Sequence, residues 1–301
     1  MTEAVLIWWY AQQLEDNQGL AEPVRAIFTA LSSTEIQAFR HGRIFLCTHV
    51  ISLFRVDRTW TNIHLLPLFD WGRSPEALAA WTGFLWSPRL YWPLMAALKE
   101  PFLQTAAHYG RLDTFGDQYV GLLTFAAIER EEPFTINDFA TATSQLPDEG
   151  LAHAAQVLSD SLQSAGDRRT DYWQNRVKPY LRAVWPKTHN ARTPQVSSQF
   201  AELLIATGDA FPHALATLRD WILPNEDTSF ALHRLAESGQ CARFPDEALD
   251  LLDLLVPHHL PWSADTLREN LIQIRNTKPI LANDARFVRL ETIVRQANLA
   301  L

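Results

Sequence analysis

The chain has 301 residues, of which 47% are hydrophobic, and its 34 acidic and 26 basic side chains give a net charge of −8. A chain of this length can bury a large core and exceeds the usual size of one domain, so it predicts two domains or one elongated helical array. The negative charge argues against nucleic acid and anionic membranes as partners, and the two cysteines are too few for a disulfide framework or a cysteine-based zinc site, which favours a cytoplasmic location.

Helix signals recur along the whole chain, and strand signals are nearly absent. The apolar run 4–11 follows Glu3 and has no small-residue cleavage site after it, which predicts a helix rather than a secretory signal. The longest segment without a charged residue, 77–88, is far shorter than the ~18 apolar residues that a membrane-spanning helix needs. Caps, apolar spacing and closing Gly or Pro residues predict helices over 3–14, 23–31, 35–56, 100–109, 113–130, 136–146, 147–164, 171–185, 194–207, 212–223, 229–238, 245–256, 264–276 and 284–299.

The segment 81–93, WTGFLWSPRLYWP, is the densest in aromatic residues. Proline occupies the first turn of helices without loss, so we expect one helix to begin at Pro75 and to end at a sharp corner where a second begins at Pro88. Aromatic residues at helical spacing normally fill the interface between packed helices. We therefore predict that Trp81 and Trp86 belong to a buried corner; a ligand cage is the alternative.

One internal repeat is visible in the second half. Phe211-Pro212, with Leu218 and Pro224, recurs 33 residues later as Phe244-Pro245, with Leu251 and Pro257, and a helix ending in Gly208 or Gly239 precedes each copy. Such helical hairpins cannot bury their apolar faces alone and must stack on their neighbours. The sequence therefore predicts an all-α fold, an irregular α-solenoid of stacked, HEAT-like helical hairpins with about fourteen helices.

Two polar stretches are the best candidates for linkers, 163–170 and 186–194. Neither is long enough to imply separately mobile domains. We expect one helical array over residues 1–301, with 1–165 and 170–301 as sub-domains.

The region around 173–186, WQNRVKPYLRAVWP, is the one basic part of this acidic chain, and Pro179 predicts a kink or break in its helix. A solvated face is one interpretation, and a docking surface for an anionic or acidic protein partner is the other. Aromatic neighbours, Tyr180 among them, also suit stacking of single-stranded nucleic acid. The candidate interaction surface comprises Arg168, Arg169, Tyr172, Trp173, Arg176, Lys178, Arg182, Lys187 and Arg192.

No catalytic or metal-binding pattern stands out. The sequence contains no phosphate-binding glycine loop, zinc-protease motif, nucleophile elbow or dinucleotide fingerprint. The adjacent pair His258-His259 fits a helix C-terminal cap better than a metal site, and the carboxylates of Glu129 to Glu132 and of Asp250 and Asp253 are expected on exposed helix ends and faces. We expect neither enzymatic activity nor a cofactor or metal.

Four segments resemble a known group of proteins: 66–71 (LPLFDW), 74–103 (SPEALAAWTGFLWSPRLYWPLMAALKEPFL), 173–186 (WQNRVKPYLRAVWP) and 208–215 (GDAFPHAL). They are similar to the helical C-terminal domain, of unknown function, of bacterial sirtuin-like anti-phage defence proteins. The resemblance covers most of the chain from about Trp60 onward, and its motifs are structural corners, so it transfers no catalytic residue.

The resemblance implies that the enzyme lies outside this sequence, in a sirtuin-like domain. We therefore expect a non-catalytic helical-repeat module that binds or senses a protein, with a phage protein or a sirtuin-like effector domain as partner. A helical-repeat nucleic-acid-binding protein, with or without base-processing activity, is the alternative, and it would use the basic stretch from Arg168 to Arg192.

Overall fold

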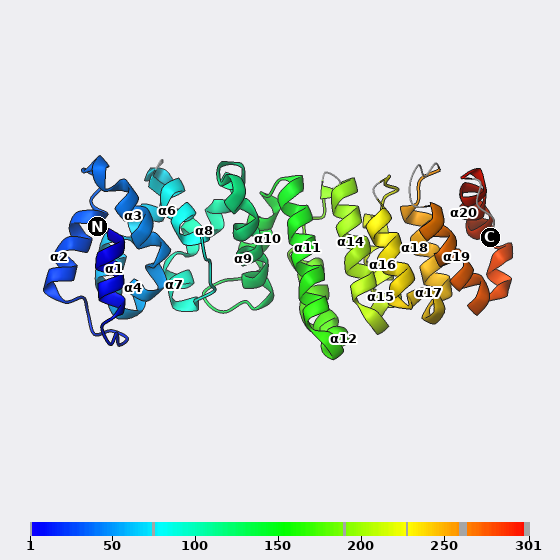
Figure 1. The fold of residues 1–301 in the computed structure, drawn as a ribbon, viewed down its shortest axis with the longest axis horizontal. Helices are drawn as coiled ribbons and strands as arrows, with labels where there is room; N and C mark the ends of the chain where they lie inside the picture. Colours follow the sequence, from blue (N-terminus) through cyan, green and yellow to red (C-terminus); the bar gives the residue numbers. More distant parts are fainter. Residues whose placement is uncertain (1, 74–75, 189–190, 227, 259–263, 298–301) are drawn as a thin grey trace. The chain divides into compact units, whose positions relative to one another are not determined.

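The computed structural model describes residues 2–73, 76–188, 191–226, 228–258 and 264–297. All regular structure in these ranges is helical, and they contain no strand, so the predicted all-α class is confirmed (Figure 1). None of the helices in the described part is long and apolar enough to cross a membrane.

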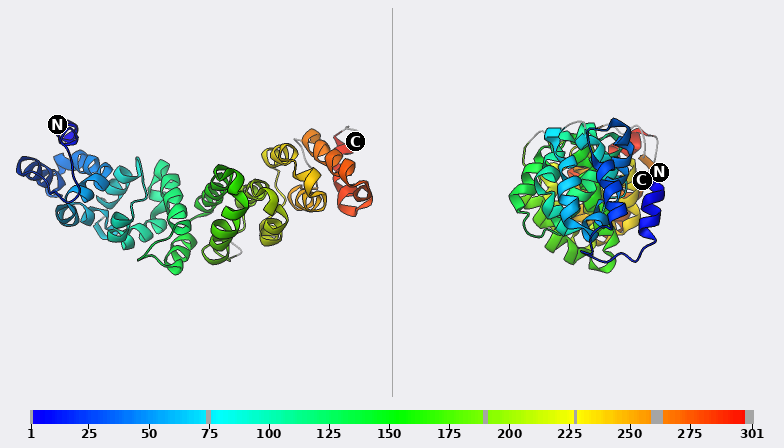
Figure 2. Two further views of the ribbon diagram at one scale, coloured as in Figure 1. Left: turned by 90° about the horizontal axis from the view of Figure 1, so that it is seen from below. Right: turned by 90° about the vertical axis from the view of Figure 1, so that its left-hand side faces the viewer.

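The chain forms two compact units, Met1–Leu146 and Pro147–Leu301. The division thus falls before the position between residues 165 and 170 that the sequence suggested. The polar stretch 163–170 joins helices within the second unit, because α11 (Asp148–Ser164), which precedes it, packs against α14 (Pro194–Ala206), which follows it (Figure 2).

The described residues form α-helices numbered α1 to α20, so the expected number of about fourteen was too low. The predicted helix 35–56 shows why. It is divided at His49, whose backbone angles lie outside the helical region, into α3 and α4. The α-helices of the first unit are α1 (Thr2–Tyr10), α2 (Glu22–Ser32), α3 (Arg40–Thr48), α4 (Val50–Val56), α5 (Arg58–His64), α6 (Glu76–Leu85), α7 (Trp92–Ala97), α8 (Lys99–Gln104), α9 (Gly116–Ile128) and α10 (Ile136–Ser144).

The aromatic segment 81–93 forms the end of α6, a connection and the start of α7. Trp81 is fully buried, as predicted, but Trp86 is 74% exposed, because it follows the last residue of α6 and leaves the core-facing stripe. The second helix begins at Trp92 rather than at Pro88, so the corner is wider than expected. The expected helix start at Pro75 lies outside the described residues.

Gly83 in α6 allows this helix to pack closely against α3. A Cβ atom on Gly83 would lie 2.6 Å from the backbone oxygen of Ile44 and 3.1 Å from Cβ of Cys47. The first of these distances is shorter than any van der Waals contact allows, so a larger residue at this position would push the two helices apart.

Gly83→Ala is therefore expected to lower the free energy of unfolding by about 1 to 3 kcal/mol through overpacking. Gly121→Ala provides the matched control, because Gly121 also lies inside a helix, α9, but has no atom within 4 Å of its added Cβ. This control should raise stability by about 0.5 to 1 kcal/mol. Chemical denaturation of the two variants measures both effects, and equal effects of the same sign would contradict the close approach.

The second unit contains α11 and α14, and in addition α12 (Arg169–Tyr172), α13 (Lys178–Ala183), α15 (Phe211–Leu218), α16 (Ser229–Ser238), α17 (Gln240–Arg243), α18 (Pro245–Leu255), α19 (Ala264–Thr277) and α20 (Ala285–Gln296). The predicted helix 171–185 is divided into α12, a π-helical segment over Trp173–Val177, and α13. The irregularity lies directly before Pro179, where a break was expected.

The two copies of the sequence repeat occupy equivalent structural positions. Gly208 and Gly239 both have positive φ angles, of 60° and 75°, which glycine adopts without strain. Phe211 and Phe244 stand at the starts of α15 and α18, and their ring centroids lie 6.2 Å apart. The repeat therefore places the same corner twice and packs the two following helices against each other.

Candidate functional site

The basic surface expected between Arg168 and Arg192 is present in part. The side chains of Arg168, Arg176, Arg182 and Lys187 are exposed, and those of Arg169, Tyr172, Lys178 and Arg192 are half-buried.

Trp173 is fully buried, so its assignment to an exposed surface was wrong. It begins a stripe that continues through Val177, Tyr180, Leu181 and Val184, all of them buried. This spacing is typical of the core-facing side of a helix and was visible in the sequence.

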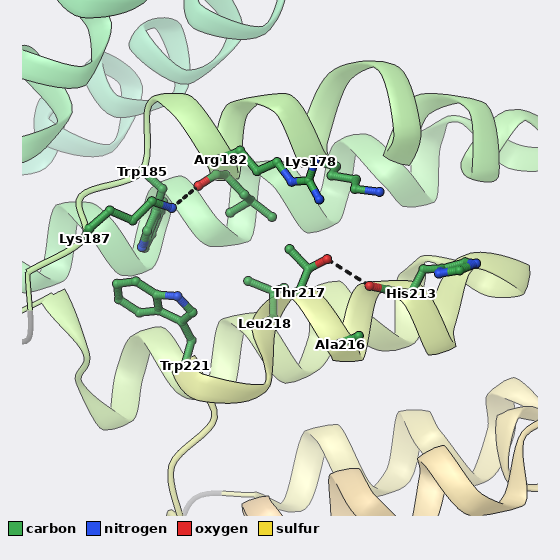
Figure 3. A pocket seen from close by; sticks show the side chains of 10 residues that line it. Lys178, Arg182, Trp185, Lys187, His213, Ala216, Thr217, Leu218 and Trp221 are labelled. Carbon is green, nitrogen blue, oxygen red and sulfur yellow. Dashed lines mark hydrogen bonds between the residues drawn. The ribbon is translucent and has the colours of Figure 1, made fainter.

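Three of the predicted basic residues line one pocket of about 440 Å³ between α13 and α15 (Figure 3). Its lining consists of Lys178, Leu181, Arg182, Trp185, Lys187, His213, Ala216, Thr217, Leu218 and Trp221. None of these described lining residues is acidic, so positive charge dominates the pocket. The other predicted surface residues do not line it.

The basic groups of this pocket differ in what they contact. The Nζ atom of Lys178 donates to Oε1 of Gln174 at 3.2 Å, and that of Lys187 donates to the backbone oxygen of Leu181. Burial lowers the pKa of Lys187 from its ordinary value. Arg182 has no hydrogen-bond or ion-pair partner among the described residues, which leaves its guanidinium group available.

One end of the pocket is aromatic. The rings of Trp185 and Trp221 meet edge to face with centroids 6.1 Å apart, and each also contacts Phe200, at 4.8 and 6.0 Å. The indole nitrogen of Trp185 is buried and has no hydrogen-bonding partner. The two tryptophans thus form an aromatic wall at this end of the pocket.

The sequence did not associate α15 with this site. His213, Thr217 and Trp221 lie about thirty residues after the basic stretch and carry no motif of their own. Their contribution follows from the Phe211-Pro212 corner, which starts α15 and directs it alongside α13. In the sequence, only the repeated Phe-Pro corner could have indicated that α15 lies beside α13.

A second hollow region follows α16. It consists of two adjoining pockets of about 490 and 430 Å³ that share His233 and Glu237, and we call it the α16 groove. Its remaining lining residues are Gln163, Arg169, Ile205, Ala206, Gly208, Phe230, Arg234, Ala236, Ser238, Gln240, Arg243, Glu269, Ile272 and Gln273.

Two polar atoms at the α16 groove have no partner. Gln240 is 1% exposed, and its Nε2 atom donates to the backbone oxygen of Gly208 at 2.9 Å, but its Oε1 atom accepts no hydrogen bond. Nε of Arg169 is likewise buried and unpaired. Phe230 is 55% exposed and lies beneath the guanidinium group of Arg234, 5.6 Å from it. The groove therefore combines unpaired polar atoms with exposed apolar surface.

The other groups considered from the sequence have structural surroundings. Within the described residues, no three His, Cys, Asp or Glu side chains are placed to hold a metal. His258 is exposed, and His259 lies outside the described residues. Cys47 and Cys241 are both buried, and burial raises the pKa of each thiol, that of Cys241 to about 12.

The acidic groups differ from the expectation at one position. The three glutamates of 129–132 are exposed, as expected. Asp250, however, is only 8% exposed and pairs with Arg219 and with Arg286, while Asp253 pairs with Arg289. These ion pairs join α18 to neighbouring helices, which gives both aspartates a structural role.

Comparison with known proteins places the chain in no family. No family model matches it, and no solved structure shows significant similarity to it. The chain is similar to "Uncharacterized protein y4cA" of Sinorhizobium fredii (strain NBRC 101917 / NGR234), with 25% identity over 143 residues. The matching part is 46% of this chain and 12% of that much longer protein.

Proposed function

We propose that the chain is a non-catalytic helical-repeat module that binds a protein partner. Support comes from the second unit, where helices contact others close to them in the chain: α14 with α15 and α16, α16 with α19, and α18 with α20. The equivalent glycine and Phe-Pro corners add a repeated element to this arrangement. Stacked hairpins of this kind form irregular α-solenoids, which offer extended surfaces to partners.

The observation that carries the proposal is the α16 groove. A peptide main chain offers N–H donors and C=O acceptors at regular intervals. A partner segment that reaches the unpaired Oε1 of Gln240 and the unpaired Nε of Arg169, after a shift of the side chains that cover them, would meet one acceptor and one donor. A buried polar atom without a partner costs about 1 to 3 kcal/mol, so a bound segment that satisfies both atoms gains that energy.

The charge of the groove indicates an acidic partner. Arg169, His233, Arg234 and Arg243 line the groove, against the two carboxylates of Glu237 and Glu269. Arg243 is already paired with Asp209, which leaves Arg169 and Arg234 to face a partner. An acidic segment with an apolar side chain against Phe230 fits this lining best.

The biological setting of the proposal comes from the sequence resemblance. The partner would be a phage protein that the module senses, or a sirtuin-like effector domain that it helps to assemble, in the cytoplasm. In either case this chain supplies recognition, and the partner or a separate domain supplies the chemistry.

The proposal is tested by capture of partners from phage-infected and uninfected bacterial cells, with wild-type chain, Phe230→Asp and Ile280→Asp as baits. Ile280 is 71% exposed in the same unit and does not line the groove, so it controls for loss of an exposed apolar residue. We expect the wild-type and Ile280→Asp baits to retain the same protein and Phe230→Asp to lose it. Equal capture by both variants, or turnover of a small substrate by the purified chain alone, would contradict the proposal.

The nucleic-acid alternative loses one of its supports in this structure. Stacking of single-stranded bases requires exposed aromatic faces along a basic track. Of the three aromatic residues on which this alternative relied, Trp173 and Tyr180 are 0% and 3% exposed, and Tyr172 is half-buried. A protein partner therefore remains the better proposal.

A further inference from the structure

The pocket between α13 and α15 is a second, separate site. It shares no lining residue with the α16 groove. Its volume, about 440 Å³, falls in the range of pockets that hold small molecules, ~300 to 1,000 Å³. A ligand in this pocket would therefore contact none of the residues that line the α16 groove.

The two ends of the pocket differ in chemistry (Figure 3). Trp185, Lys187 and Trp221 lie at one end, and the side chains of Lys178 and Arg182 extend along α13 toward the other end, where His213 lies. The hydroxyl of Thr217 already donates to the backbone oxygen of His213 at 2.9 Å. A ligand would therefore meet a flat aromatic wall at one end and cationic donors at the other.

The absence of any acidic residue from the described lining of this pocket favours an anionic ligand. Elsewhere in the second unit, Arg219, Arg286 and Arg289 are neutralised by Asp250, Asp284 and Asp253. Arg182 has no such partner among the described residues, and no carboxylate lines its pocket. A guanidinium group forms paired hydrogen bonds with phosphate or carboxylate oxygens, and Lys178 would add a second positive charge.

The aromatic wall indicates that the part of the ligand beyond its anionic group is a planar ring. Planar rings pack favourably against indole groups, and Trp221 is only half-buried, so part of its ring faces the pocket. Trp185 and Phe200 contact the ring of Trp221 and so restrict its motion, which lowers the entropy that binding would cost. The pocket thus suits a flat ring linked to an anionic group and is larger than a bare phosphate requires.

We propose that this pocket binds a nucleoside monophosphate, with the phosphate at Arg182 and Lys178 and the base against Trp221. The positive charge of the pocket favours the phosphate over an uncharged nucleoside, and the indole wall favours the base over a sugar phosphate. The volume of about 440 Å³ suits one nucleotide rather than several stacked bases of a polymer.

Calorimetric titration of the full chain at low salt tests the proposal with AMP, GMP, CMP and UMP as probes, and with adenosine, ribose 5-phosphate and inorganic phosphate for comparison. At least one nucleotide should bind about tenfold or more tightly than adenosine, ribose 5-phosphate and phosphate. Equal binding of that nucleotide and ribose 5-phosphate would overturn the role of the indole wall. Absence of binding by all four nucleotides would overturn the proposal, as would binding of a single-stranded oligonucleotide alone.

Variants of the exposed Arg182 assign the phosphate without disturbing the core. Arg182→Ala should weaken nucleotide binding about tenfold or more, and Arg182→Lys should weaken it less. Arg295→Ala is the control, because Arg295 is an exposed arginine of the same unit that pairs only with Glu291, one helical turn away. The Arg295→Ala variant should bind the nucleotide as tightly as the wild type. Unchanged binding in Arg182→Ala would overturn the assignment. Phe230→Asp should bind the nucleotide normally, which separates this test from that of the protein partner.

Discussion

Trp81→Ala is expected to lower the free energy of unfolding of the first unit by about 3 to 5 kcal/mol. The indole is fully buried, and its ring contacts Phe69, Phe84 and Phe102 with centroids 5.1, 5.9 and 6.3 Å away. Its Nε1 atom donates to the backbone oxygen of Phe69 at 3.1 Å. The substitution therefore creates a large cavity and leaves a buried carbonyl without its donor.

Thermal and chemical denaturation measure this loss, and the melting temperature of the first unit should fall by several degrees. Trp86→Ala is the matched control, since it removes the same side chain five residues later from a position that is 74% exposed. A surface change of this kind should alter stability by less than about 0.5 kcal/mol. Similar melting temperatures of the two variants would show that Trp81 does not occupy the core.

Glu76→Gln is expected to destabilise the first unit by about 3 kcal/mol or more. Arg43 is 2% exposed, and its Nε and Nη2 atoms donate to the two carboxylate oxygens of Glu76 at 3.0 and 3.2 Å. Its Nη1 atom donates to the backbone oxygens of Ser33 and Ile36. The neutral amide of glutamine keeps the volume but leaves a buried positive charge without its counter-charge.

Denaturation of Glu76→Gln, Arg43→Met and the double variant measures this effect. The double variant should be more stable than Glu76→Gln alone, because it removes the uncompensated charge as well. Glu22→Gln is the control: Glu22 pairs with Arg25 at 3.9 Å, and its side chain is 88% exposed, so its loss should cost little. If the change in the free energy of unfolding of the double variant equalled the sum of the two single changes, Arg43 and Glu76 would act independently.

The features of the fold that could be predicted follow from local patterns in the sequence. The Phe-Pro corners, the positive-φ glycines and the burial of Trp81 all followed from spacing and residue type. The division of the helix at His49 did not, because the apolar pattern continues on both sides of it. The two halves differ in their neighbours, since α3 contacts α2 and α6 and α4 contacts α5. Such divisions, together with α5 and α17, which no predicted helix covered, made the expected number of helices too low.

The candidate sites were predicted less completely. Lys178, Arg182 and Lys187 were identified by charge and lie in one pocket, whereas His213 and Trp221 were missed because they come from α15 and from the 3-10 turn that follows it. The α16 groove was missed altogether except for Arg169. Gln240 shows the reason: an unpaired buried amide oxygen is a property of the packed structure and leaves no trace in the order of residues.

The placement of contacts in the second unit affects how this unit reaches its folded state. Its helices find most of their partners among helices that follow shortly in the chain. Bringing such neighbours together closes only modest loops, and chains with mostly short-range contacts fold quickly. Helices made early can thus associate while later ones are still being synthesised on the ribosome.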